Sequence, residues 1–452
     1  MKTILYNSLE RITSLYRYYE IQEASIKDIV KKGSKQNYLG YSIDRYFRLL
    51  VNGKNVELPQ YEKLNTYVKD HIEIFEVYQK ENSVRFRYKN PEALKKEGIE
   101  LDVRTASSEF QHYCEMPLTL RENTLVMLIT RFEEFISKMI SFIYEKHPQK
   151  YLDSQKISFS EIVNCGVDEV RNKIISREVD NMMRQSNKEW FKLFESQGMN
   201  LNGCKSELDA FKEINARRNI IVHNMGRVNS IYLQQVPSSK VELNSYIETT
   251  ESYIKEVFSV VKTLIFIIYI EAIRMADMCD RAKLIEYSFT IAFDELCKEN
   301  YSLCKTVYLS LSENKFADAQ YKYMSKVNYW ISMIELGHMN KVVDEIRQFD
   351  VSALDVKFVI AKNLLLEEYD EAVELIESQW KKTVFQKMIE EWPIYRKFRE
   401  TPQYEAFIER HSEDYSVTMI EVEDAENAAT EDICAEQLQF EDNQMKESVT
   451  VS

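Results

Sequence analysis

The chain has 452 residues, which is long enough for two to four domains with full cores. It contains only nine glycines and seven prolines, far below the roughly 12% of residues that these two types average together. This scarcity excludes a turn-rich β architecture and predicts an all-α fold. The formal charge is −14, but residues 421–452 hold ten acidic residues and one lysine, a net of −9 that leaves −5 for the rest. The overall charge therefore does not exclude a nucleic-acid partner.

The seven cysteines are scattered and include no CxxC pair, which favours reduced thiols in the cytoplasm over a disulfide framework or a zinc site. The first residues lack the apolar run of a signal peptide. The most apolar stretch, residues 257–270, is interrupted by Lys262 and is shorter than the about 20 residues that cross a bilayer. We therefore expect a cytoplasmic protein that neither enters a membrane nor uses a metal or another cofactor.

Residues 1–115 are expected to form an N-terminal domain of uncertain type, either helical or a small α+β domain. Apolar spacing predicts helices over residues 4–24 and 60–80. Residues 46–58, which contain an Asn-Gly turn signal, and residues 84–88 have the composition of short strands that pair with each other.

Residues 116–280 are predicted to form an antiparallel helical bundle. Its first helix has a clear 3.6-residue apolar stripe, at positions 125, 128, 129, 132, 135, 136, 139 and 143. Five helices are expected, over residues 118–144, 159–183, 189–196, 206–223 and 241–275. Gly226 supplies the stop signal after the fourth helix.

Residues 281–412 are also predicted to be helical, with short helices in pairs. With an offset of 30 residues, Met339 matches Tyr369 and Val342 matches Ala372, and residues 314–319 give a looser third copy. This region resembles degenerate tetratricopeptide-type repeats, and we expect it to bind a protein partner or a trigger. An ordinary helical bundle with chance similarity is the alternative. Residues 413–452 are expected to be an acidic, disordered tail.

The fourth predicted helix places an arginine inside its apolar stripe. On a helical wheel, Arg218 falls among Phe211, Ile214, Val222 and Met225. A guanidinium does not lose its charge, so this side chain needs either a route to water or an anionic partner. The same helix therefore carries a candidate site for an anion.

Arg218, Asn219 and His223 form a motif in which four residues separate the arginine from the histidine. This motif resembles the signature of HEPN domains, which is an arginine, a polar residue and then a histidine after four to six intervening positions. Arg217 also satisfies that spacing, with five intervening residues. The resemblance covers about residues 116–280. It implies a helical bundle that acts as a metal-independent endoribonuclease, often in prokaryotic toxins and antiviral, abortive-infection type defence systems.

Cleavage of RNA by its own 2′-hydroxyl needs a base, an acid and positive charge near the phosphate. Histidine as a residue type can act as base or acid at neutral pH, so His223 is the candidate for the proton transfers. Arg218 would bind the phosphate bidentately, and Asn219, one turn before the histidine, would orient the imidazole or contact the phosphate. We expect the neighbouring polar residues to bind substrate; these are Arg217, Asn224 and Arg227. The products would carry 2′,3′-cyclic phosphate ends.

Arg218 and His223 project about 140° apart around one helix, which does not suit a compact site within one chain. We therefore expect a homodimer through the fourth helix, with one composite site, as the HEPN resemblance also implies. Ile220, opposite the main stripe, is consistent with a second buried surface. One alternative is a catalytically inactive HEPN-fold adaptor that binds partners through its helical repeats. Another is that Arg218 merely pairs with a carboxylate of its own bundle.

Overall fold

The structure is a computed structural model, and it describes residues 1–51, 62–70, 75–80, 83–88, 103–148, 159–380 and 383–411. Its contacts divide the chain into two compact units, Met1–Ala276 and Asp277–Ser452. The described residues are predominantly helical, and the two strands among them form one antiparallel hairpin. The predicted all-α class is therefore confirmed apart from that hairpin. The predicted tail, residues 413–452, lies outside the described residues.

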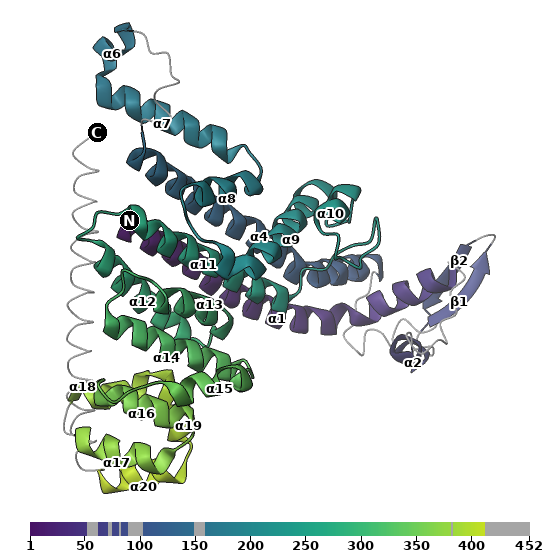
Figure 1. Ribbon diagram of the computed structural model, residues 1–452. Coiled ribbons are helices and arrows are strands. Elements are labelled where there is room, and N and C mark those ends of the chain that lie inside the picture. Colours follow the sequence, from purple (N-terminus) through teal and green to yellow (C-terminus); the bar gives the residue numbers. More distant parts are fainter. Residues whose placement is uncertain are drawn as a thin grey trace, which may run out of the picture. The chain divides into compact units, whose positions relative to one another are not determined.

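The first unit is built around two long helices, α1 and α4, which pack along each other (Figure 1). Its helices are α1 (Lys2–Val51), α2 (Glu62–Asp70), α4 (Val103–Lys146), α6 (Phe159–Cys165), α7 (Val167–Met183), α8 (Asn187–Ser196), α9 (Lys205–Asn224), α10 (Ser230–Gln235) and α11 (Glu251–Ala272). The described residues of this unit also form two short 3-10 helices, η2 (Asn202–Cys204) and η3 (Ile273–Met275), and the strands β1 (Phe75–Lys80) and β2 (Ser83–Tyr88).

The core of this unit lies where α11 contacts α1, α4 and α9. Residues 264–270 of α11 are buried on every side, which explains why that stretch is apolar all round. The predicted stripe of α4 is also fully buried, as shown by Leu125, Phe132 and Met139. Among the described helices, none is long and apolar enough to span a bilayer.

The N-terminal region differs from the prediction in several places. The helix expected over residues 4–24 is the first half of α1, and residues 46–51 belong to the same helix instead of a strand. Of the helix expected over residues 60–80, Glu62–Asp70 is the helix α2. The prediction is wrong over Phe75–Lys80, because these residues form β1 and pair with β2. Alternation with a period of two along these segments is typical of strands. Residues 52–61 lie outside the described residues.

The expected domain break between residues 115 and 116 falls inside α4. Because α1 packs along α4, both belong to the first unit. The ion pair between Arg121 of α4 and the buried Glu23 of α1 joins them, and Arg11 of α1 bonds Glu134 of α4 at 2.9 Å. The N-terminal helix is thus an integral part of the bundle.

The second and fifth predicted helices are shorter than expected. Gly166, with φ 81°, separates α6 from α7 within residues 159–183. Helix α11 begins only at Glu251, where the side chain of Thr250 accepts a hydrogen bond from the Tyr253 amide at 3.2 Å. The residues between α9 and α11 form the short helix α10, which was not predicted, and the segments on either side of it. These segments meet in an isolated antiparallel β-bridge between Arg227 and Tyr246.

The burial of α9 corrects part of the predicted stripe. Phe211 and Ile214 are buried, as expected, but Val222 is 49% exposed and Met225 is 86% exposed. Ile220 is buried inside the chain, in a small cluster with Ala216, Val228, Tyr232 and Ile247. The second buried surface of α9 is therefore covered by α10 and the following loop, so Ile220 gives no support to a dimer.

The second unit consists of short helices in pairs. They are α12 (Arg281–Cys297), α13 (Tyr301–Ser312), α14 (Ala319–Glu335), α15 (Met339–Gln348), α16 (Val356–Leu365), α17 (Tyr369–Gln379), α18 (Thr383–Glu391), η4 (Pro393–Tyr395), α19 (Arg396–Arg399) and α20 (Pro402–Arg410). Helix α14 contacts α12 and α16, so the first helices of successive pairs pack on each other.

Three of these pairs share one turn geometry. A residue with positive φ stands two positions before the second helix in each pair, at Glu299, Gly337 and Glu367. The next amide then bonds a carbonyl five residues back, with N–O distances of 3.0, 2.8 and 2.9 Å. The matched Met339 and Tyr369 both begin second helices. Residues 314–319 instead link two pairs, so the third copy of this turn lies at Glu299 and not there.

Helix α9 ends in two left-handed residues, Met225 with φ 51° and Gly226 with φ 71°. The Gly226 amide bonds the Ile220 carbonyl at 3.0 Å, and its carbonyl accepts the Ile247 amide at 3.0 Å. A Cβ atom at this position would lie 2.5 Å from the Tyr246 ring. The turn after the candidate motif therefore requires glycine.

We expect Gly226→Ala to lower the free energy of unfolding by about 2–5 kcal/mol, because left-handed strain adds to overpacking against Tyr246. Gly337→Ala is the matched control, since Gly337 also has positive φ in a turn after a helix but a Cβ there would meet nothing within 4 Å. That change should cost only about 1–2 kcal/mol. Urea denaturation measures both, and equal losses would contradict the predicted clash.

Candidate functional site

Arg218 faces helix α4 because the apolar side of α9 packs there. The rings of Phe211 and Phe132 lie 4.7 Å apart between their centroids. This contact places Arg218 opposite Glu133, and its Nη2 donates a hydrogen bond to Glu133 Oε1. Arg218 Nη1 donates to Asn219 Oδ1 at 3.3 Å. The Arg218 Nε atom is buried and has no acceptor in the described part of the chain.

The ion pair of Arg218 with Glu133 is only partly buried. The side chains of Arg218 and Glu133 are 22% and 31% exposed. Burial raises the pKa of the Glu133 carboxyl, and the charge of Arg218 offsets this effect only in part. A carboxylate that is costly to keep charged is a replaceable partner, and an anion from solution with more acceptor atoms could take its place.

Arg218, Asn219 and Glu133 line an open cleft of about 1140 Å³. Its walls come from α4, α8, η2 and α9, with the end of α10 and the residues before α8 at its edge. Five basic side chains line it, namely Lys188, Lys192, Lys205, Lys212 and Arg218, against three carboxylates, Glu133, Glu195 and Asp209. Seven amide side chains also line it, namely Gln185, Asn187, Asn202, Asn215, Asn219, Gln234 and Gln235. The cleft is thus locally basic and rich in hydrogen-bonding groups within a chain of net charge −14.

His223 is exposed and does not line the cleft. The next residues form the turn that follows α9, where Asn224 Nδ2 donates to the Arg227 carbonyl at 2.6 Å. Arg227 Nη1 in turn donates to the Asn244 carbonyl at 3.2 Å. One chain therefore brings Arg218 and Asn219 together but leaves the imidazole on a separate face, as the 140° offset predicted.

Arg217 points away from the cleft into a polar cluster. Its Nε donates to Glu213 at 2.8 Å, and its guanidinium lies 3.8 Å from the centre of the Tyr253 ring. Glu213 also accepts hydrogen bonds from the hydroxyls of Tyr232 and Tyr253, at 2.8 and 2.7 Å. Burial and the charge of Glu213 raise the pKa of Tyr232 to about 12, which keeps its hydroxyl protonated as a donor. In this conformation Arg217 is held inside the chain.

The adjacent carboxylates Glu133 and Glu134 diverge, as their positions on one helix predict. Glu133 bonds Arg218, while Glu134 bonds Arg131 and Arg11. Within the described ranges, no three or more His, Cys, Asp or Glu side chains gather so that they could hold a metal ion.

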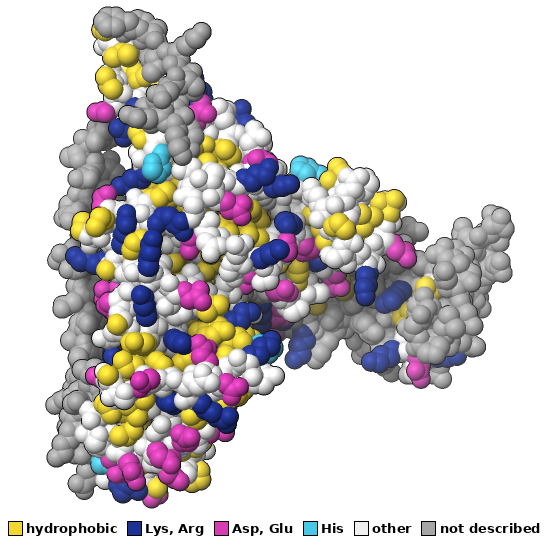
Figure 2. Space-filling view, viewed as in Figure 1, with side chains coloured by type: hydrophobic (Ala, Val, Ile, Leu, Met, Phe, Trp, Pro, Cys, Tyr) yellow, Lys and Arg dark blue, Asp and Glu magenta, His cyan; other side chains and the backbone are white. Residues whose placement is uncertain are grey.

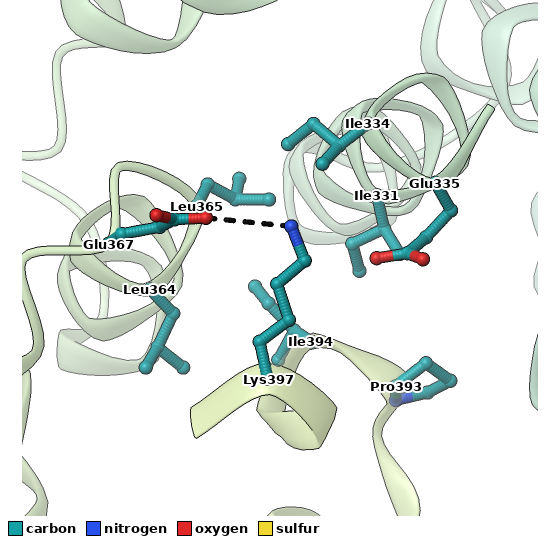
Figure 3. A pocket seen from close by; sticks show the side chains of 9 residues that line it. All are labelled: Ile331, Ile334, Glu335, Leu364, Leu365, Glu367, Pro393, Ile394 and Lys397. Atoms are coloured by element: carbon teal, nitrogen blue, oxygen red, sulfur yellow. Dashed lines mark hydrogen bonds and ion pairs between the residues drawn. The ribbon is translucent and has the colours of Figure 1, made fainter. Parts of the chain in front are cut away.

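The second unit has a much smaller cavity, of about 30 Å³, between α14, α16 and the η4–α19 segment (Figure 3). Apolar side chains such as Ile331 and Leu364 line it, and the ion pair of Lys397 with Glu367, at 3.5 Å, lies across it. Ligand pockets commonly have about 300–1,000 Å³, so this cavity is too small for an organic ligand.

No protein-family model, curated protein or solved structure matches the chain.

The cleft residues from α8 and the preceding segment were not predicted. Lys188, Asn187 and Gln185 carry no recognisable motif, because lysines and amides are ordinary surface residues. The local enrichment of both types between residues 185 and 205 was the available signal.

We expect Glu213→Ala to lower the free energy of unfolding by about 2–4 kcal/mol, because Arg217 and two tyrosine hydroxyls lose their acceptor. Asp209→Ala is the control, since it removes only the exposed pair with Lys212. That change should cost less than about 1 kcal/mol. Thermal unfolding followed by circular dichroism measures both, and similar melting temperatures for the two variants would contradict the role of the cluster.

Proposed function

We propose that this protein is a metal-independent endoribonuclease that uses a composite Arg218-Asn219-His223 site between two copies of the chain. The observation that carries this proposal is the position of Arg218 and Asn219 on the wall of a basic cleft, with His223 of the same motif exposed elsewhere. The resemblance of the motif to HEPN nucleases supports a role in the cytoplasm as a prokaryotic toxin or an antiviral, abortive-infection type effector.

The residues have the chemistry that RNA cleavage needs. Arg218 would bind the scissile phosphate and stabilise the charge that develops on its oxygens. Its Nε is buried and has no acceptor among the described residues, so it would become a further donor only after the phosphate has displaced Glu133. His223 of the other copy would take the 2′-hydroxyl proton or protonate the leaving 5′-oxygen. Asn219 would hold the imidazole or the phosphate, and the products would carry 2′,3′-cyclic phosphate ends.

The surface around His223 supports contact with a second copy. Figure 2 shows hydrophobic side chains gathered over α10 and the adjoining loop. Val222, Met225 and Ile231 are 49%, 86% and 60% exposed. Three large apolar side chains beside one histidine favour a protein contact there, although Ile220 is covered within the chain. A two-fold contact through this patch would place His223 of both copies at the interface.

The ion pair of Arg218 with Glu133 favours a second candidate function. If Glu133 holds Arg218 permanently, the bundle is a catalytically inactive dimerisation module, and the helix pairs of the second unit bind its partners. In the nuclease, the RNA phosphate displaces Glu133 from Arg218. The two functions therefore differ in whether that ion pair opens.

Wild-type protein should cleave RNA in the presence of EDTA and leave 2′,3′-cyclic phosphate ends. We expect His223→Ala and Arg218→Ala each to reduce the cleavage rate by at least about 100-fold. Lys240→Ala is the control and should retain most of the activity, because Lys240 is an exposed residue of the same unit that does not line the cleft. Gel analysis of end-labelled RNA measures the rates. Cleavage that survives both main substitutions would contradict the site, and no cleavage by the wild type would favour the inactive module.

The dimer should depend on the exposed apolar residues near His223. We expect Met225→Glu to convert the dimer to a monomer, because it places a charge in a desolvated contact. Met278→Glu is the matched control, since Met278 is 84% exposed but lies in the second unit. Sedimentation equilibrium at micromolar concentration measures both. A wild-type monomer, or a Met225→Glu dimer, would contradict this interface.

A further inference from the structure

The cleft is large for a small-molecule site and follows much of α9. Its volume of about 1140 Å³ exceeds the about 300–1,000 Å³ of common ligand pockets. It extends from Lys205, at the start of α9, to Arg218, thirteen residues later. At about 1.5 Å per residue this is roughly 20 Å. A stacked strand has one phosphate about every 3.4 Å, so the wall matches roughly six nucleotides.

Two lysines of the cleft form no salt bridge within the described residues, although the charge of Lys205 helps Lys212 to lower the pKa of Asp209. Lys192 and Lys212 form ion pairs with Glu189 and Asp209, at 2.7 and 2.6 Å. Lys188 and Lys205 are exposed, and neither forms a salt bridge in the described part of the chain. Free cations at a cleft wall are suited to phosphates, whose counterions they replace.

The amide side chains of the cleft suit nucleobases. Those of Asn187, Asn202, Asn215 and Gln235 have no hydrogen-bond partner among the described residues. Each can donate and accept at once, as the edge of a base does. Phe191, half-buried in the same wall, offers a ring face or edge to a stacked base. Base edges and faces are accessible in a single strand but not in an A-form duplex.

We infer that this cleft binds a single RNA strand of about six nucleotides, with Lys188 and Lys205 on its phosphates and the cleft amides on its bases. The strand leads to Arg218, so the inference rests on the proposed nuclease function and names its substrate as unpaired RNA. Phosphate binding positions the strand, and the amides give it a base preference.

Binding is measured by fluorescence anisotropy with oligomers that carry 2′-fluoro sugars, because these lack the attacking hydroxyl. Affinity should rise with length up to about six nucleotides and then level off. A duplex of the same sequence should bind at least about tenfold more weakly. The double variant Lys188→Gln, Lys205→Gln should bind the single strand about tenfold more weakly, with a salt slope smaller by about 1.4, from about 0.7 for each phosphate contact.

Lys240→Gln is the matched control, because Lys240 is an exposed lysine of the same unit that does not line the cleft. It should bind within twofold of the wild type, and unchanged melting temperatures show that all variants fold. A double variant with wild-type affinity, or a duplex that binds as tightly as the single strand, would overturn the inference.

The two proposals fail in different ways. Lysine-dependent binding of the single strand without any cleavage would leave the cleft site standing and remove the nuclease. Cleavage that needs Arg218 but is unaffected by the lysine variant would leave the nuclease standing and remove the cleft site.

Discussion

The packing of α9 on α4 determines in which directions Arg218 and His223 of the candidate site point. Phe211 meets Phe132 in the core, and this contact fixes the rotation of α9 about its axis. Because residues 218 and 223 are then about 140° apart, the arginine faces the cleft and the histidine faces solvent. A covering layer of α10 and its loop buries Ile220 on the far side. The helix therefore has no freedom to bring both groups of the motif to one place.

The adjacent arginines Arg217 and Arg218 have opposite roles for the same reason. Arg217 meets Glu213, which also accepts two tyrosine hydroxyls, so that cluster is well satisfied and rigidifies the bundle. Arg218 meets Glu133, whose pKa is raised by burial, and one of its own nitrogens has no acceptor within the described residues. An external anion would add a hydrogen-bond acceptor only for Arg218, because Arg217 already has its acceptors within the chain. Arg217 thus holds the fold, and under the proposed function Arg218 would bind a phosphate.

The sequence predicted the elements with strong local signals and missed those that depend on tertiary context. The stripe of α4 and the position of α9 follow from periodicity, and the matched second helices that begin at Met339 and Tyr369 follow from the offset of 30 residues. The hairpin partner of β2 was misassigned, because a six-residue segment with alternating residues carries little information about helix or strand. The exposure of Val222 and Met225 was not predicted. The layer that α10 and its loop form covers the other side of α9, and no local sequence pattern indicates that layer. Glu133, 85 residues away, becomes the partner of Arg218 only through folding.

Mixing two inactive variants shows whether Arg218 of one copy works with His223 of another. Arg218→Ala and His223→Ala proteins are combined in equal amounts, allowed to exchange subunits, and assayed for RNA cleavage in EDTA. The composite site of a wild-type dimer contains two Arg218–His223 pairs. Half of the random dimers are mixed, and each mixed dimer keeps one of these pairs intact, so about a quarter of the wild-type activity should return. Activity no higher than that of either variant alone, in a sample shown to contain mixed dimers, would contradict the composite site.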